Sequence, residues 1–185
     1  MIPTQKERLR QLLLSKSYER REVKLASGKT SDFYFDGKQT TLDAEGSRLV
    51  GELFWQAIEA SGRRVEAIGG PTLGADPIVT AVSLTSALKR KPIPAFIVRK
   101  EPKKHGTGAW IEGEKNLKKG MQVALVEDVV TSGGSILKAA QKVEEAGYCV
   151  SLIASIVDRE DGGAEKIREK GYRFLSLFTK TELLS

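Results

Sequence analysis

The sequence contains one cysteine and one histidine, and it lacks any long apolar run. Because Cys149 has no second cysteine to pair with, an intrachain disulfide and a cysteine-based metal cluster are both excluded. No apolar stretch approaches the ~20 residues needed to cross a bilayer, and the N-terminal segment lacks the small-residue cleavage site of a signal peptide. We therefore expect a cytoplasmic protein without a membrane partner.

Two common phosphate-binding motifs are also missing. The chain lacks the complete G-x-x-x-x-G-K-[ST] pattern of a P-loop, because Val23 stands where the first glycine would precede Gly28-Lys29-Thr30. It also has no G-x-G-x-x-G dinucleotide fingerprint. Internal repeats and low-complexity tracts are absent as well. Any phosphate site in this protein must therefore be built in another way.

What is present fits one soluble domain of 185 residues, 40% of them hydrophobic and 29% charged. The formal net charge of +6 suggests an anionic partner. Four basic residues crowd into one short segment, which contains Arg99, Lys100, Lys103 and Lys104, and the only histidine, His105, follows them directly. Taken alone, this segment could equally be a solvated basic loop.

The hydrophobic pattern predicts an α/β fold with a mainly parallel central sheet flanked by helices. We expect a helix over 4–16, two short strands within 22–36 and a helix over 43–61. Alternation follows, with strands at 65–70, 92–99, 121–127, 149–157 and 172–178, and with helices at 74–90, 133–146 and 163–170. In such folds ligands bind beyond the carboxyl ends of the strands.

One such strand end carries the sequence VALVEDVVTSGGS, residues 123–135. The small residues after the strand offer backbone N–H groups at a helix N-terminus, which favours a phosphate. Glu127 and Asp128 would repel that phosphate unless they bind another part of the ligand, such as a sugar diol. A ribose 5-phosphate satisfies both halves of the motif. Alone, the loop could also be a tight turn with a serine cap.

VALVEDVVTSGGS resembles the phosphoribosyl pyrophosphate signature of type I phosphoribosyltransferases. The resemblance implies one domain over 1–185, with a small N-terminal hood mainly from residues 1–42 and a core over about 43–180. It implies that the donor is bound by Arg99, Lys100, Lys103, His105, Glu127, Asp128, Val129, Val130, Thr131, Ser132, Gly133, Gly134 and Ser135.

Three further segments are similar to orotate phosphoribosyltransferases. FIVRKEPKKHGTGAWIEG (96–113) resembles their mobile catalytic loop, and GKTSDFYFDGKQTTLDAEG (28–46) resembles their hood, where Tyr34 and Phe35 would border the base. IVDRED (156–161) places Arg159 at the base-binding arginine, so the resemblance implies that Thr131 and Arg159 bind orotate. IGGPTLGADPI (68–78) is similar to the pyrophosphate cradle of the family. Without the resemblance, each segment could be an ordinary strand or turn.

The resemblance implies a Mg²⁺-dependent transfer of the phosphoribosyl group to orotate in UMP synthesis, with Lys103, Glu127 and Asp128 as catalytic residues. It implies that Mg²⁺ is held through substrate and water, and that a homodimer shares the catalytic loop between subunits. Lysines found in some members are replaced here by Ala26 and Gly74. Two alternative functions are a phosphoribosyltransferase for another nucleobase and a nucleic-acid-binding regulator with the same fold. No helix-turn-helix extension is apparent, so we expect no nucleic-acid partner.

Overall fold

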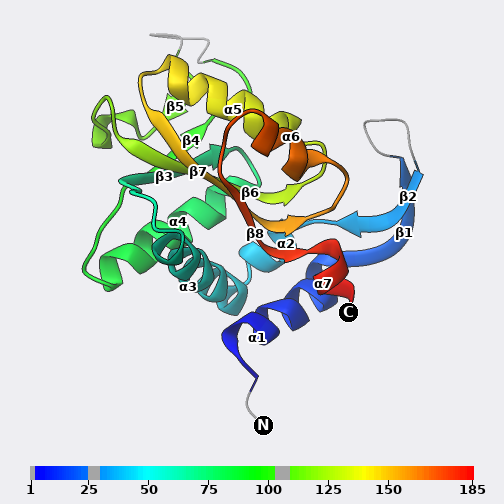
Figure 1. Ribbon diagram of the computed structural model, residues 1–185. Coiled ribbons are helices and arrows are strands. Elements are labelled where there is room, and N and C mark those ends of the chain that lie inside the picture. The colour runs from blue at the N-terminus through cyan, green and yellow to red at the C-terminus, as the bar shows by residue number, and fades with distance from the viewer. Residues whose placement is uncertain (1–2, 25–29, 103–108) are drawn as a thin grey trace.

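The computed structural model describes residues 3–24, 30–102 and 109–185. Its centre is a six-stranded sheet with the order β5-β4-β3-β6-β7-β8, in which only β5 runs antiparallel to its neighbour (Figure 1). The prediction of an α/β fold with a mainly parallel sheet is confirmed. The strands are β3 (Ala67–Pro71), β4 (Ala95–Val98), β5 (Ile111–Glu112), β6 (Gln122–Val130), β7 (Cys149–Asp158) and β8 (Phe174–Thr179).

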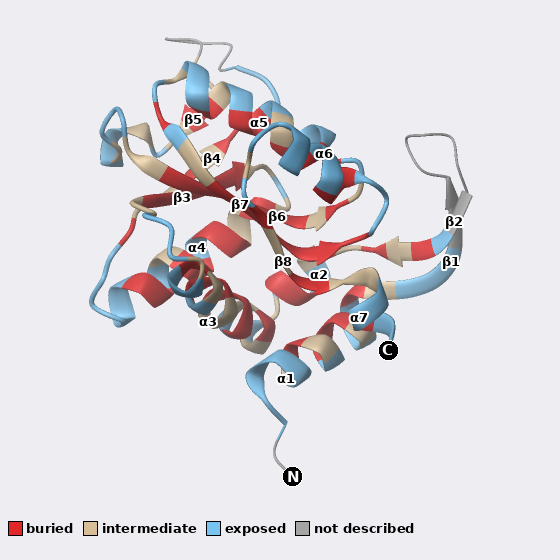
Figure 2. Cartoon of the chain, viewed as in Figure 1, coloured by how far each residue is buried: buried red, intermediate tan, exposed pale blue. Residues whose placement is uncertain are grey.

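Helices cover both faces of this sheet. Figure 1 shows α3 (Ala44–Ala60) and α4 (Ala75–Leu88) on one face, with α5 (Gly134–Glu145) and α6 (Gly163–Glu169) on the other. Each pair encloses its own buried cluster, so the central strands are buried on both sides (Figure 2). The four apolar residues 123–126 are each 0% exposed, which explains why this strand reads as a continuous apolar run. In the described part of the chain, no helix has the length and apolarity to span a bilayer.

The N-terminal region forms a separate layer beside the sheet. Helix α1 (Gln5–Leu12) begins at the Thr4–Glu7 capping box that its sequence predicts, but it gives way to a π-helical turn at Leu13–Ser17 before the expected end at 16. The two predicted strands are β1 (Tyr18–Lys24) and β2 (Thr30–Phe35), which pair antiparallel in a sheet of their own. Strand β1 therefore starts earlier than expected, because it follows directly on the π-helical turn.

Four short elements were not expected from the sequence. They are α2 (Lys38–Thr41), β5, the 3₁₀ turn at Glu114–Asn116, and α7 (Lys180–Leu184). Strand β4 is shorter than the expected 92–99, since Pro92 and Pro94 lack the N–H that a strand ladder needs. Strand β6 is longer than the expected 121–127 and continues to Val130. This last difference bears directly on the site.

Candidate functional site

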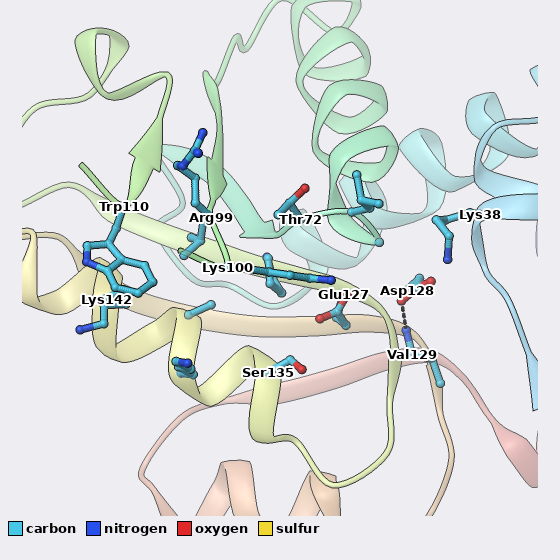
Figure 3. A pocket seen from close by; sticks show the side chains of 16 residues that line it. Lys38, Thr72, Arg99, Lys100, Trp110, Glu127, Asp128, Val129, Ser135 and Lys142 are labelled. Carbon is cyan, nitrogen blue, oxygen red and sulfur yellow. Dashed lines mark hydrogen bonds between the residues drawn. The ribbon is translucent and has the colours of Figure 1, made fainter. Parts of the chain in front are cut away.

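A cleft of about 580 Å³ opens where β3 and β6 end (Figure 3). These two strands are adjacent and parallel, but the chain leaves them toward opposite sides of the sheet, so the cleft lies at the topological switch point where such folds bind ligands. Its lining residues are Lys38, Pro71, Thr72, Leu73, Gly74, Val98, Arg99, Lys100, Trp110, Glu127, Asp128, Val129, Ser135, Lys138, Ala139 and Lys142.

Both acids of the pair lie inside β6. The strand was expected to end at 127, which would have placed Asp128 after it. Glu127 is paired with Ser155 of β7, and Val129 is paired with Val157, so the strand ladder continues past both acids. Glu127 is 9% exposed and Asp128 is 8% exposed. The Asp128 Oδ1 atom accepts a hydrogen bond of 2.9 Å from the N–H of Val129. The position of both carboxylates is therefore fixed by the sheet.

Two glycines make room for these carboxylates. A Cβ atom on Gly74 would lie 2.6 Å from Asp128 Oδ1 and 2.7 Å from Glu127 Oε1. A Cβ atom on Gly37 would lie 2.6 Å from the Cβ of Asp128. Gly74 comes from the β3–α4 connection and Gly37 from the end of the hood, so Asp128 lies between two segments that are distant in the sequence. Any larger residue at either position would displace the acid.

Burial makes the acid pair costly in its charged form. Desolvation, followed by the neighbouring charge of Asp128, raises the pKa of Glu127 well above its ordinary value. Desolvation also raises the pKa of Asp128, and the positive charge of Lys38 opposes this shift. A ligand that donates hydroxyl hydrogen bonds to the two carboxylates would replace the water that burial has removed.

The loop after β6 forms a small hollow of about 100 Å³ at the start of α5, lined by Glu127 and residues 129–136. Gly133 has φ +72°, a left-handed conformation that glycine adopts readily, and no side chain caps the helix. The first N–H groups of α5 have no partner within the helix and point toward its N-terminal end. The hollow, the backbone N–H donors and the positive end of the α5 dipole together favour binding of a phosphate group.

Cationic side chains line the end of the cleft away from the hood. Arg99 Nη1 lies 2.8 Å from Glu112 Oε1, and Lys142 Nζ lies 4.8 Å from the centre of the Trp110 ring. Figure 3 shows Lys100 extending along the cleft toward Glu127. Lys103 and His105, which the sequence predicts for the same site, lie outside the described residues.

Arg159 lies next to the loop, at the end of β7. Its side chain is 9% exposed, its N–H donates a 3.0 Å hydrogen bond to the carbonyl of Val130, and its Nε lies 3.3 Å from Asp161 Oδ2. The guanidinium carbon is 5.3 Å from the centre of the Phe33 ring. The structure therefore brings Arg159 close to Thr131.

Phe33, a hood aromatic that the resemblance did not name, contacts Arg159. Tyr34 points to the other side of β2, where Arg21 lies 3.6 Å from the centre of its ring. Phe35 is 9% exposed and belongs to the hydrophobic core. Successive side chains of a strand alternate between its faces, so Phe33 and Phe35 share a side that Tyr34 does not.

Lys38 is a cleft residue that the sequence analysis did not single out. It is the first residue of α2, lines the cleft beside Asp128, and its Nζ lies 2.6 Å from Asp36 Oδ1. A one-turn helix leaves no periodic pattern, and a lone lysine among threonines looks like a solvated residue. The local sequence pattern therefore does not identify Lys38 as a cleft residue.

The described residues contain no group of three or more His, Cys, Asp or Glu side chains placed to hold a metal ion. Mg²⁺ does not require such a group, because it is usually bound through one or two carboxylates and keeps several water ligands. Glu127 and Asp128 offer two adjacent carboxylates in the cleft.

Fold and cleft together define a class, the type I phosphoribosyltransferases. The family of phosphoribosyl transferase domains matches residues 38–178, which include the β3–α4 connection, the acid pair and the loop before α5. The resemblance found in the sequence is therefore confirmed at the level of this class.

Individual relatives narrow the class. An orotate phosphoribosyltransferase of Sorangium cellulosum is 46% identical over 181 residues, covering 98% of this chain and 94% of the relative. The crystal structure of Mycobacterium tuberculosis orotate phosphoribosyltransferase with Fe(III) dicitrate has a TM-score of 0.84 and 36% identity, covering 97% of this chain and 99% of that one. Another structure of that enzyme, in complex with 5-phospho-alpha-D-ribosyl 1-diphosphate, has a TM-score of 0.80 and 34% identity, with coverage of 98% and 100%. The chain belongs to the orotate phosphoribosyltransferase family.

Proposed function

We propose that the protein is a Mg²⁺-dependent orotate phosphoribosyltransferase. It transfers the 5-phosphoribosyl group from phosphoribosyl pyrophosphate to orotate, which gives orotidine 5′-phosphate and pyrophosphate in UMP synthesis. One observation carries the proposal: two buried carboxylates lie directly before a phosphate-sized hollow at a helix N-terminus, with a buried arginine beside it. The similarity to orotate phosphoribosyltransferases over nearly the whole chain supports it.

The reaction is a displacement at C1 of the ribose. The bond between C1 and the pyrophosphate oxygen breaks, and its electron pair leaves with pyrophosphate. A ring nitrogen of orotate, which gives up its proton to water, forms the new bond to C1. The transition state resembles an oxocarbenium ion with positive charge on the sugar ring. Glu127 and Asp128 accept hydrogen bonds from the ribose hydroxyls and favour that positive charge, while residues 131–135 hold the 5′-phosphate. No side-chain nucleophile is required.

Arg159 and Thr131 bind orotate. Orotate carries a carboxylate, and the planar guanidinium of arginine can bind a carboxylate with two parallel hydrogen bonds. Arg159 lies beside the sugar-phosphate hollow, because its own N–H is bonded to Val130. The base and the phosphoribosyl group would thus meet over the end of β6.

The leaving pyrophosphate is stabilised by Arg99, Lys100, Lys103 and His105, as the family resemblance implies. Cations near the departing oxygen lower the energy of the charge that develops on it. When bound, Mg²⁺ neutralises part of the pyrophosphate charge; Glu127 and Asp128 are the residues that would hold its water ligands. Arg99 is kept at the cleft by its ion pair with Glu112.

The test is to follow orotate absorbance with purified protein, phosphoribosyl pyrophosphate and Mg²⁺. We expect the spectrum to change as orotidine 5′-phosphate forms, and we expect no product with uracil or purines. Arg159→Gln should raise the KM for orotate more than the KM for the donor. An unchanged orotate spectrum at saturating substrates, or faster transfer to another base, would contradict the assignment.

The assembly and location are part of the same proposal. The protein forms a cytoplasmic homodimer in which the catalytic loop of one subunit serves the site of the other, and each subunit is one domain with a hood mainly from 1–42 and a core over about 43–180. Mixing two inactive variants, Lys103→Ala and Asp128→Asn, tests the sharing. Restored activity in the mixture supports it, whereas inactivity at every ratio argues against it.

A further inference from the structure

The turn that carries Arg159 has an unusual backbone conformation. Glu160 has φ +59°, in the left-handed region that a residue with a Cβ atom rarely adopts. Its N–H donates a 2.9 Å hydrogen bond to Oδ1 of Asp158, the buried last residue of β7. A residue stays in such a conformation where its neighbours hold it there. The contacts of Glu160 therefore decide the direction in which the chain leaves Arg159.

The C-terminal helix supplies the strongest of these contacts. Glu160 Oε2 accepts a 2.7 Å hydrogen bond from the hydroxyl of Thr181 and a 2.8 Å hydrogen bond from its N–H. Thr181 lies in the first turn of α7, where backbone N–H groups have no partner within the helix. The bonds from the hydroxyl and the N–H of Thr181 lower the pKa of Glu160, so its carboxylate is ionised at neutral pH. Glu160 thus joins the turn after β7 to α7.

Helix α7 is itself fixed to the rest of the subunit. Leu183 is 0% exposed and belongs to the buried cluster that contains residues of α1, α3 and the sheet. The Arg10 side chain of α1 donates a 3.2 Å hydrogen bond from Nε to the carbonyl of Glu182. The helix follows directly on β8, whose last residue, Thr179, is paired with Asp158 at the end of β7 (Figure 1). It is therefore a firm support at the same edge of the sheet as the turn.

The Arg159 side chain depends on the direction of this turn. Its Nε lies 3.3 Å from Asp161 Oδ2, on the far side of Glu160 in the chain. A different φ at Glu160 would move Asp161 away from the guanidinium. The guanidinium carbon lies 5.3 Å from the centre of the Phe33 ring, and Nζ of Lys180, the first residue of α7, lies 5.4 Å from the same centre. Helix α7 therefore reaches the surroundings of Arg159 both through Glu160 and through Phe33.

Resting on the proposed function, we propose that Glu160 is a positioning residue for the acceptor base: its bonds to α7 hold the turn in the conformation that directs the Arg159 guanidinium to the carboxylate of orotate. Glu160 does not touch the base, because it acts through Arg159. A guanidinium binds a carboxylate with two parallel hydrogen bonds when the two planes are aligned, so a small rotation of Arg159 weakens the contact. The C-terminal helix thereby takes part in binding the base.

The test measures KM for orotate and KM for the donor in variants of Glu160. Glu160→Ala removes both bonds to Thr181, and it should raise KM for orotate about fivefold while KM for the donor stays within about twofold. Glu160→Gln keeps an oxygen that can accept both bonds, so it should restore KM for orotate to within about twofold of the wild type. Glu160→Gly also lacks the bonds, but glycine adopts a positive φ readily, so its KM for orotate should lie between the two.

Glu182→Ala is the matched control. Glu182 Oε2 accepts a 3.0 Å hydrogen bond from the N–H of Thr179, so this carboxylate caps the same helix from within. We expect Glu182→Ala and Glu160→Ala to lower the melting temperature by similar amounts, but we expect Glu182→Ala to leave both KM values unchanged. An equal rise in KM for orotate in the two variants would assign the effect to the stability of α7 and would overturn the inference.

Two further results count against the positioning role. One is a Glu160→Ala protein whose KM for orotate equals that of the wild type, and the other is a rise of both KM values by the same factor. If thermal melting shows that Glu160→Ala does not fold, Thr181→Val takes its place, because it removes the 2.7 Å bond to Glu160 and retains the helix N–H. Thr181→Val should raise KM for orotate about threefold, and a value equal to that of Glu182→Ala overturns the inference.

The wild-type protein in the same assay separates this inference from the proposed reaction. A wild type that does not convert orotate refutes the proposed function and, with it, the inference. A wild type that converts orotate with the same KM as every Glu160 variant leaves the proposed function in place and overturns the inference alone.

Discussion

The two ends of the cleft hold charges of opposite sign in different environments. At the carboxylate end, Glu127 and Asp128 are 9% and 8% exposed and are fixed by the β6 ladder and by two glycines. At the cationic end, the Arg99 side chain is 38% exposed and extends from a chain segment next to residues outside the described part. Buried charges interact strongly with a ligand because little water screens them. Exposed charges interact more weakly because water and salt screen them, and neighbouring charges can compensate for their loss. Substitutions at the two ends should therefore differ greatly in effect.

The largest effect is expected from Asp128→Asn at the carboxylate end. The amide preserves the shape of the side chain but removes the charged acceptor that we propose for a ribose hydroxyl, so kcat/KM for the donor should fall about a hundredfold or more. Steady-state kinetics with varied donor measures this loss, and thermal melting verifies that the variant is folded. A loss below about threefold would place the sugar elsewhere.

Gly74→Ala should affect the same end through packing. The new methyl group would lie 2.6 Å from Asp128 Oδ1, so the acids or the β3–α4 connection must move, at a cost of about 1–3 kcal/mol in the free energy of unfolding. Urea unfolding measures the change. Gly134→Ala is the stability control, because its methyl group would meet only Ser132 Oγ at 3.7 Å. Equal stability of the two variants would mean that the acid pair can shift freely.

Glu127→Gln should have a smaller effect on stability, in the stabilising direction. The folded protein raises the pKa of Glu127 well above the ordinary 4.5, so its ionised form is penalised on folding. That penalty is absent below about pH 4.5 and complete once the pH exceeds the raised pKa. The variant should therefore melt about 2–4 °C higher at pH 8 and near the wild-type temperature at pH 4.5. A shift that is equal at both pH values would contradict the raised pKa.

Lys142→Gln tests the cationic end and should have the smallest effect. Its ammonium contacts Glu145 and the Trp110 ring, and other cations line the same wall. We expect kcat/KM to fall about twofold at low salt and the difference to vanish near 0.5 M salt, where the screening length is a few ångströms. Kinetics over a salt series measures this, and a tenfold loss that resists salt would remove the contrast between the two ends.

The sequence identified the carboxylate end well because burial leaves a readable pattern. The apolar run before Glu127 predicted the central strand, the hydrophobic pattern predicted the helix over 43–61 that is α3, and the motif placed both acids beside the loop. Arg159 is next to that loop in space, which a single sequence cannot show but the resemblance implied.

Two parts of the molecule escaped prediction for different reasons. The Thr179–Glu182 capping box of α7 has a recognisable spacing and could have been found by the rule that located α1. Lys38 could not, because its place in the cleft beside Asp128 depends on the tertiary packing of a one-turn helix. Local patterns do not record which distant residue a charge will face.

Asp128 is packed between Gly37 of the hood and Gly74 of the β3–α4 connection, so its carboxylate contacts both parts of the subunit. The side chain that we propose binds the sugar is thereby also packed between the N-terminal layer and the β3–α4 connection. Exchanging residues 1–42 for those of another protein is consequently expected to displace Asp128, and with it the proposed sugar contact, unless the replacement also has glycine at position 37.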